Sequence, residues 1–151
     1  MLDFNEETLN HAKNKFINIK SESKRKTEIS FLKQSVQNLL RNSEKSINGS
    51  KKYDLIYCSG LYDYLSDNVC KSLNSYLFRR LEPGGLLVVG NFAPNTPVKY
   101  FIEYFLEWFL IYRNKSQLLE LAPEGANSED CLLAAEPTTT NIFLEVRKGN
   151  E

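Results

Sequence analysis

The chain has few of the residues that most often carry catalysis or bind metal ions. Among its 151 residues it has one histidine, His11, and three cysteines, Cys58, Cys70 and Cys131. His11 falls on the polar side of a predicted helix, so we expect neither a histidine base nor a histidine-containing metal site. The cysteines are odd in number and widely spaced, which argues against a metal-binding spacing and a disulfide framework. A reducing, cytoplasmic environment is the simpler interpretation.

A surplus of positive charge is also missing. Nineteen lysines and arginines balance nineteen aspartates and glutamates, so the formal net charge is zero. Proteins that bind nucleic acids or membrane surfaces nonspecifically rely on a basic surplus, and we expect neither partner.

Long hydrophobic runs are missing as well. The most apolar segment, residues 100–112, contains Glu103 and Glu107 and is shorter than the ~20 residues that a membrane-spanning helix needs. Near the N-terminus, Asp3 and two following glutamates stand where a secretory signal would carry basic residues. The sequence therefore predicts no membrane span, and its length predicts one domain over residues 1–151.

What the chain does contain is an alternation of short apolar strands and helices. The pattern predicts strands over residues 1–3, 29–35, 53–58 and 86–92, helices over 5–16, 36–42, 66–81, 97–113 and 114–122, and a final hairpin over 131–148. Polar loops are expected over residues 20–28 and 43–52, and the EPGG segment, residues 82–85, is expected to separate a helix from a strand. Such alternation predicts an α/β fold with a mostly parallel sheet and a C-terminal antiparallel hairpin at one edge.

Three stretches carry a resemblance to a known family: LDFNEETLNHA, YDLIYCSGLYDYL and LEPGGLLVVGNF. With the order of the elements, they resemble the class I S-adenosylmethionine-dependent methyltransferases read from their second strand onward. The resemblance implies a three-layer Rossmann-like sheet and S-adenosylmethionine as the cofactor. More narrowly, GLYDYL, GNFAPN and EWFLIYRNKSQLLELA are similar to the bacterial proteins named for making 3-hydroxypalmitate methyl ester, which implies a small or fatty-acid carboxylate as the methyl acceptor.

The same resemblance implies a set of cofactor-binding residues. Asp3 would accept hydrogen bonds from both ribose hydroxyls, Phe4 would pack against the adenine, and backbone groups at Ser35 and Val36 would meet the adenine edge. Ser59, after the third predicted strand, would lie in the active-site loop. Simpler interpretations stay open for two of these residues: Asp3 as a surface acid, and Ser35 as the N-cap of the following helix. Where the family has an acid that contacts the adenine amine, this chain has Ser35, and a hydroxyl is a poorer partner.

A second set of residues is expected to contact the methyl acceptor. It combines positions after the third and fourth predicted strands with positions in the aromatic helix: Tyr62, Tyr64, Asn91, Trp108 and Arg113. Ligands of parallel α/β sheets bind at the carboxyl ends of the strands. Arg113 would either end its helix as a favourable charge or clamp a substrate carboxylate. The aromatic helix has more rings than one packed face needs, and the surplus would line a lipid-like substrate pocket or form a homodimer surface.

One departure from the family is large. Its first strand and its glycine-rich GxGxG loop, which lets the methionine end of the cofactor approach the backbone, have no counterpart in the sequence. We therefore expect an N-terminally truncated methyltransferase domain that binds the cofactor weakly on its own. The catalytic residues stay unknown, and a carboxylate acceptor, already a nucleophile, would need no base. Two alternatives remain: a non-catalytic remnant that acts as an interaction module, and another nucleotide-binding α/β protein such as a dehydrogenase fragment.

Overall fold

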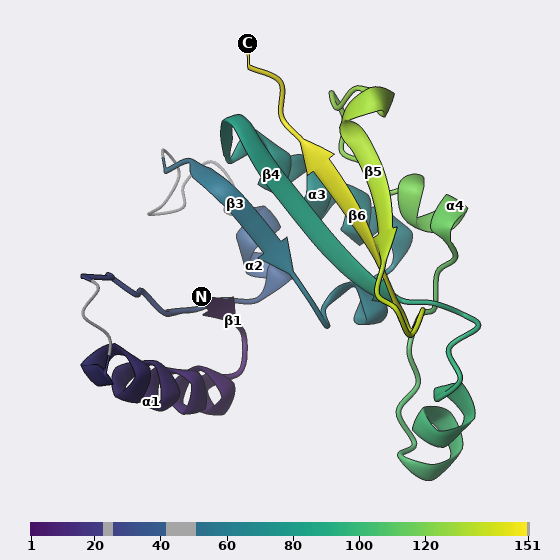
Figure 1. The fold of residues 1–151 in the computed structure, drawn as a ribbon, viewed down its shortest axis with the longest axis horizontal. Helices are drawn as coiled ribbons and strands as arrows, with labels where there is room; N and C mark the ends of the chain where they lie inside the picture. The colour runs from purple at the N-terminus through teal and green to yellow at the C-terminus, as the bar shows by residue number, and fades with distance from the viewer. Residues whose placement is uncertain (23–25, 42–50, 151) are drawn as a thin grey trace. The chain divides into compact units, whose positions relative to one another are not determined.

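The computed structural model describes residues 1–22, 26–41 and 51–150, which divide into two compact units, Met1–Gly49 and Ser50–Glu151 (Figure 1). The single domain expected over residues 1–151 stays a prediction. The polar loops expected over residues 20–28 and 43–52 include residues 23–25 and 43–50, which lie outside the described residues.

Two short parallel strands and two helices make up the first unit. β1 (Leu2–Asp3) pairs with β2 (Leu32–Lys33), and α1 (Glu6–Glu22) and α2 (Val36–Arg41) follow the respective strands. The prediction of a strand over residues 29–35 is wrong in length. The ladder is short because β1 itself offers only two residues to pair with.

The start of α1 follows from a local cap. The Oδ1 atom of Asn5 accepts hydrogen bonds from the backbone N–H groups of Glu7 at 2.8 Å and Thr8 at 3.3 Å. These are two of the N–H groups that the first turn of a helix leaves without intrahelical partners. The predicted helix is therefore confirmed, and it continues beyond its expected end at residue 16, to Glu22.

A four-stranded mixed sheet forms the second unit, in the order β3-β4-β6-β5 (Figure 1). Its strands are β3 (Tyr53–Cys58), β4 (Leu81–Phe92), β5 (Cys131–Ala135) and β6 (Asn141–Arg147). β3 and β4 are parallel, whereas β6 runs antiparallel to both β4 and β5. The C-terminal hairpin is confirmed, but this sheet is not mostly parallel, because the hairpin contributes two of its three strand pairings.

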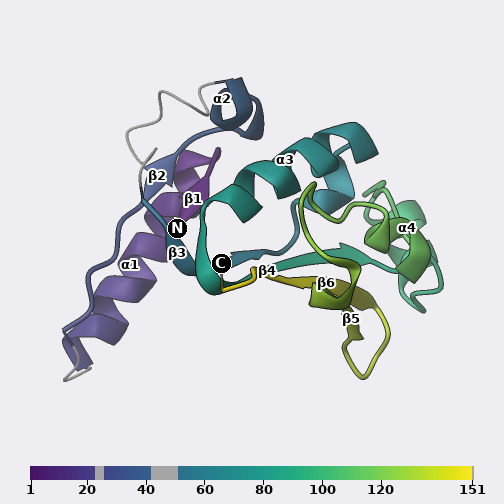
Figure 2. The same cartoon turned by 90° about the horizontal axis from the view of Figure 1, so that it is seen from above.

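Both helices of the second unit, α3 (Asp67–Arg79) and α4 (Lys115–Leu119), lie on the same side of this sheet (Figure 2). The core lies between them and the sheet, and it includes the buried side chains of Leu73, Leu87, Leu118, Leu144 and Val146. On the opposite face Leu55 and Tyr57 are 58% exposed and Leu132 is 63% exposed. The second unit by itself therefore shows two layers.

The EPGG segment does not interrupt β4 in the way the sequence suggests. Tyr53 pairs with Leu81, but Leu55 pairs with Leu86, so the strand bulges between these two pairings and then resumes. Gly84 sits in the bulge with φ +76°, a conformation that favours glycine. The helix before it ends at Arg79 rather than at residue 81, so the expected boundary between helix and strand is corrected by two residues.

The long aromatic helix expected over residues 97–113 is wrong. Helical structure there is limited to residues 99–105, which include a π-helical turn (Phe101–Phe105), and Glu107 then adopts φ +50°. The chain after it runs without regular structure, because its backbone pairs with distant groups: the Ile111 N–H donates to the Asp63 carbonyl at 2.8 Å and the Arg113 N–H to the Phe92 carbonyl at 3.1 Å. The helix expected over residues 114–122 is confirmed in a shorter form as α4.

Candidate functional site

The acid predicted to bind ribose lies at the carboxyl end of β1. Asp3 is half-buried, and its Oδ1 atom accepts a hydrogen bond from the Asn5 N–H at 2.8 Å. That contact fixes the turn between β1 and α1. The carboxylate has no other hydrogen bond among the described residues, so acceptor capacity remains. Phe4, next in the chain, is 67% exposed.

Ser35 and Val36 lie at the matching end of β2. Asp3 is paired with Lys33 across the parallel ladder, and the Gln34 N–H donates to the Asp3 carbonyl at 2.9 Å. The Oγ atom of Ser35 accepts from the Asn38 N–H at 3.2 Å, which confirms its role as the cap of α2. The first unit thus brings four of the predicted cofactor-binding residues to one edge of its small sheet.

In the second unit, β3 ends at Cys58, and the exposed Ser59 and Gly60 follow. Gly60 has φ +68°, the left-handed conformation that turns the chain away from the strand. A short 3₁₀ turn, η1 (Tyr62–Tyr64), comes next, and the end of β4 lies beside it through a hydrogen bond from the Phe92 N–H to Asp63 Oδ1 at 2.7 Å.

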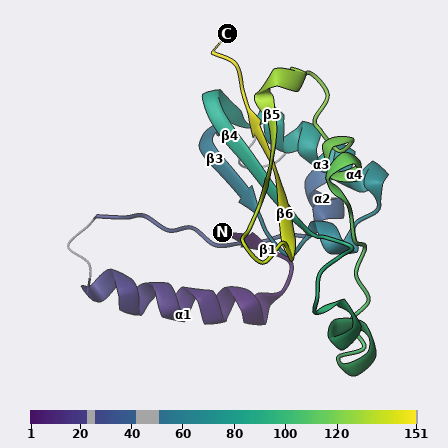
Figure 3. The same ribbon diagram turned by 45° about the vertical axis from the view of Figure 1, so that its right-hand side comes forward.

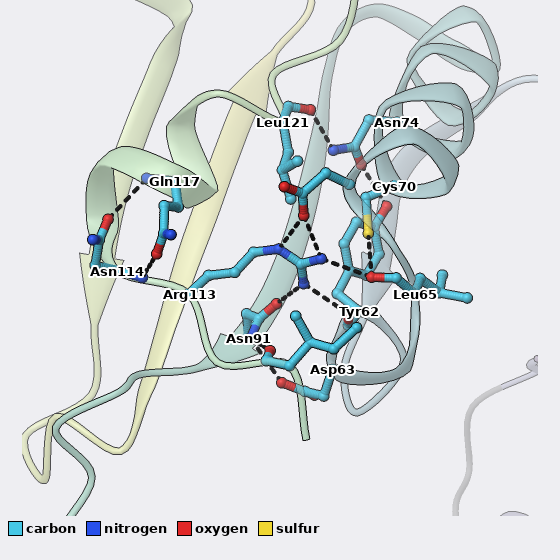
Figure 4. Close-up of polar contacts among 12 residues, drawn as sticks. Tyr62, Asp63, Leu65, Cys70, Asn74, Asn91, Arg113, Asn114, Gln117 and Leu121 are labelled. Carbon is cyan, nitrogen blue, oxygen red and sulfur yellow. Dashed lines mark hydrogen bonds and ion pairs between the residues drawn. The ribbon is translucent and has the colours of Figure 1, made fainter. Parts of the chain in front are cut away.

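Arg113 lies at the centre of a buried polar network (Figure 4). Its side chain is 2% exposed and pairs with Asp67, whose Oδ1 accepts from Nε at 3.0 Å and from Nη2 at 2.7 Å. Nη2 also donates to the Leu65 carbonyl at 2.7 Å. Nη1 donates to the Tyr62 carbonyl at 2.8 Å and to Asn91 Oδ1 at 2.6 Å. All five N–H donors of the guanidinium are therefore used within the protein.

A second carboxylate, that of Asp63, is buried in the same network. Its Oδ1 accepts from Asn91 Nδ2 at 2.9 Å as well as from the Phe92 N–H. Burial raises the pKa of Asp63, while the hydrogen bond from Phe92 and the charge of Arg113 oppose that rise. Asp63 thereby ties η1 to the end of β4.

Tyr62 and Asn74 extend the network toward α4. The fully buried Tyr62 donates its hydroxyl hydrogen bond to Asn74 Oδ1, and Asn74 Nδ2 donates to the Leu121 carbonyl at 2.6 Å (Figure 4). Asn74 was not among the residues predicted from the sequence to lie at the site. It follows Leu73 and falls four residues after Cys70, on the buried side of its helix, and a polar residue on such a stripe signals an internal hydrogen-bond partner.

These contacts engage three of the predicted substrate-binding residues within the protein, and their role in substrate binding stays a prediction. Tyr62, Asn91 and Arg113 are at most 2% exposed, and their polar side-chain groups have partners within the protein. A residue that clamps a substrate carboxylate needs free donors, and Arg113 has none. Arg113 also ends no helix, because residues 107–114 are not helical. In the structure these three side chains link the ends of the strands to the neighbouring loops.

Tyr64 and Trp108, the other two predicted substrate-binding residues, form an exposed aromatic pair. Trp108 Nε1 donates to the Tyr64 hydroxyl at 2.6 Å, and the rings stack with centroids 6.5 Å apart. Phe92 meets Trp108 edge-on at 6.3 Å. With Tyr64 52% and Trp108 41% exposed, this pair offers an apolar surface next to the ends of β3 and β4.

The cysteines of the chain are free thiols. Burial raises the pKa of Cys58 and of Cys70 to about 11, so both thiols stay protonated near neutral pH. Across residues 1–22, 26–41 and 51–150, no group of three or more histidine, cysteine, aspartate or glutamate side chains could hold a metal ion. In the same part of the chain, no helix has the length and apolar character to cross a membrane.

Comparisons with known proteins bear on the fold. No protein-family model matches the chain, and no curated protein matches it. Solved structures do. The N-methyltransferase NodS from Bradyrhizobium japonicum has a TM-score of 0.60 and 15% identity, with 98% of this chain and 71% of that chain covered. Magnesium protoporphyrin IX methyltransferase from Synechocystis has a TM-score of 0.61 and 15% identity, covering 98% and 62%.

The fold is the one that these methyltransferases share. A structure described as a possible exported protein from Bordetella parapertussis is similar too, with a TM-score of 0.66, 17% identity, and 98% of this chain and 52% of that chain covered. The chain spans between 52% and 71% of the length of the three structures. Because one fold hosts many functions, the likeness establishes the architecture, and activity has to be argued from the residues.

Proposed function

We propose that the chain is part of an S-adenosylmethionine-dependent methyltransferase, and that its first unit binds the adenosine end of the cofactor. The observation that carries this proposal is the position of Asp3 at the carboxyl end of β1, beside Ser35 at the end of β2. Ligands of parallel α/β sheets bind at such strand ends. The fold supports the proposal, since one similar methyltransferase structure contains S-adenosylhomocysteine and another S-adenosylmethionine.

The residues present fit an adenosine group. A carboxylate has about four acceptor positions, and Asp3 uses one for the Asn5 N–H. The remaining positions would accept hydrogen bonds from the two ribose hydroxyls. The exposed ring of Phe4 would pack against the adenine. Because the Ser35 hydroxyl caps α2, backbone groups at Ser35 and Val36 would meet the adenine edge instead.

The cofactor would supply an activated methyl group on a sulfonium. The chain would contribute binding, alignment and exclusion of water. Tyr64 and Trp108 would hold an apolar or lipid-like part of a small-molecule acceptor. A fatty-acid carboxylate is the acceptor that we favour, because it is already a nucleophile. Among the described residues no base is assigned, since Asp63 and Arg113 are engaged internally.

The alternative of another nucleotide-binding protein, such as a dehydrogenase fragment, has less support. The solved structures that resemble the chain include methyltransferases, and the antiparallel hairpin that the methyltransferase resemblance implies is present as β5 and β6. The alternative of a non-catalytic interaction module rests on a different feature, the exposed aromatic segment after β4.

The test measures the binding of adenosine and of 2′-deoxyadenosine to the whole chain by saturation-transfer NMR. Adenosine should bind about tenfold more tightly, because each hydrogen bond to a carboxylate contributes roughly 1.5–3 kcal/mol. Asp3→Asn keeps the oxygen that holds the Asn5 N–H but removes the charge, so it should weaken adenosine binding and abolish the preference. Glu7→Gln, a neighbouring exposed acid, serves as the control. Equal binding of the two nucleosides by the unmodified chain would contradict the proposal.

A further inference from the structure

The segment between β4 and α4 carries an unusual concentration of exposed apolar side chains. Nine large hydrophobic residues within residues 98–111 are at least 41% exposed. We call this segment the aromatic arm, and Figures 1 and 3 show it projecting beyond one end of the sheet of its own unit. Six of these nine exposed residues are aromatic: Tyr100, Phe101, Tyr104, Phe105, Trp108 and Phe109.

The arm has a defined conformation. Ile102 and Leu110 anchor it, being 6% and 9% exposed. The Ile102 N–H donates to the Val98 carbonyl at 2.9 Å, and the Trp108 N–H donates to the Ile102 carbonyl at 3.0 Å. The exposed rings are already stacked on one another, Phe101 on Phe105 with centroids 5.0 Å apart. A surface arranged before contact loses little conformational entropy when a partner covers it.

The area of the arm matches what a stable protein interface needs. The six rings are 41–77% exposed. An aromatic side chain buries about 150–250 Å² when fully covered, so these rings together offer roughly 800 Å². That exceeds the largest apolar patch of a typical monomer, about 300–600 Å². If all six rings were covered, this area would reach the ~800 Å² that each partner contributes to a standard interface.

The shape and charge of the arm limit the kind of partner. Small-molecule sites are concave, whereas the arm projects outward (Figure 3). Glu103 and Glu107 lie within it and Lys99 is its one basic residue, a balance that disfavours anionic lipid surfaces and acidic partners. A second copy of the same arm presents the same stacked rings, and aromatic rings associate readily with one another in offset or edge-to-face pairs.

We propose that the aromatic arm is an isologous dimer contact, in which the arms of two copies of this chain pack against each other. In such a dimer the same surface of both copies forms the interface, so each arm residue occurs in it twice, once from each copy. The inference is independent of cofactor binding, since it uses no residue of the first unit. Trp108 is already paired with Tyr64 in the acceptor surface proposed above, so the dimer contact rests on the other five rings of the arm.

Sedimentation velocity of the full chain over a wide concentration range tests this proposal. The unmodified chain should sediment with twice the 17.4 kDa mass of one copy. Phe105→Lys and Tyr104→Lys, at positions 75% and 77% exposed, should stay folded by circular dichroism and raise the dissociation constant of the dimer roughly thirtyfold or more. Leu132→Lys, at a position 63% exposed on β5, is the matched control and should leave the dimer intact.

Three outcomes would overturn the proposal. One is a chain that stays monomeric at every concentration, including a monomer that binds phosphatidylcholine vesicles through the arm. Another is an unchanged dissociation constant in both arm variants. The third is a loss of the dimer in Leu132→Lys equal to that in the arm variants, which would place the contact on the sheet.

Discussion

Replacing Arg113 with alanine should destabilise the second unit by about 3–5 kcal/mol, because it removes the hydrogen bonds that a buried guanidinium donates. The substitution would leave Asn91 Oδ1 without a donor, and it would remove one of the two hydrogen bonds that the Tyr62 and Leu65 carbonyls each accept. A buried acceptor that is left unsatisfied costs roughly 1–3 kcal/mol, and each of the other lost hydrogen bonds costs roughly 0.5–1.5 kcal/mol. The lost ion pair with Asp67 adds little, because the Asp67 side chain is 66% exposed and water can replace the arginine.

A comparison with Arg113→Lys separates charge from geometry. Lysine keeps the positive charge, but its three donors radiate from one nitrogen and cannot reproduce a fork that reaches four groups. We expect it to cost about 2 kcal/mol, since at least one or two buried acceptors lose their partner. Arg79→Ala is the control, because Arg79 is an exposed arginine of α3, and it should change stability by less than about 0.5 kcal/mol.

Urea unfolding followed by tryptophan fluorescence is the suitable assay. Trp108 is the single tryptophan of the chain, so its signal reports on the second unit alone. A signal averaged over both units need not follow a two-state transition. If Arg113→Ala unfolds at the same urea concentration as the unmodified chain, the network does not stabilise the unit. Normal stability with lost affinity for a carboxylate acceptor would restore the substrate clamp that the sequence suggested.

Three further predictions follow from single contacts. Asp3→Ala should destabilise the first unit by about 1 kcal/mol because it removes the acceptor of the Asn5 N–H, whereas Asp3→Asn keeps that acceptor; equal melting curves for the two variants would contradict this. Burial raises the pKa of Asp63, so its stabilising contribution is present at acidic pH and is lost as the pH rises through the folded pKa. Asp63→Asn should therefore flatten the dependence of the urea midpoint on pH, and an unchanged slope would refute the assignment. Under native conditions thiol reagents should modify Cys131, which is partly exposed, before the fully buried Cys70, and mass spectrometry that finds equal rates would show local opening around Cys70.

Local signals in the sequence predicted most of the elements. The cap at Asn5 started α1 where expected, and the apolar run at Tyr53–Cys58 became β3. The hairpin was also found, because two alternating strands flank a short polar turn. In each case the residues that decide the structure lie within a few positions of one another, so a pattern along the chain suffices.

The aromatic segment was mispredicted because its structure depends on distant partners. Apolar residues at helical spacing favour a helix over residues 97–113, but that pattern carries no information about Tyr62 or Asp67, which lie 51 and 46 positions from Arg113. Once the guanidinium binds both, the preceding backbone has to extend to reach them. Tertiary contacts override helix propensity in this way when a buried charge has to be satisfied.

The five predicted substrate-binding residues fall into two groups in the structure, buried polar residues and exposed aromatic residues. Polar residues at the ends of strands serve either a ligand or the neighbouring loops, and the residue type alone does not distinguish the two. The number of hydrogen-bond donors that have no partner within the protein does distinguish them. Arg113 and Asn91 have none, so they fix the edge of the sheet, whereas Tyr64 and Trp108 keep exposed ring surfaces. A cation whose five donors are occupied can bind a carboxylate only by breaking the network that holds it in place. The substrate binding that we propose at this edge of the second unit therefore relies on aromatic contact and not on the buried arginine.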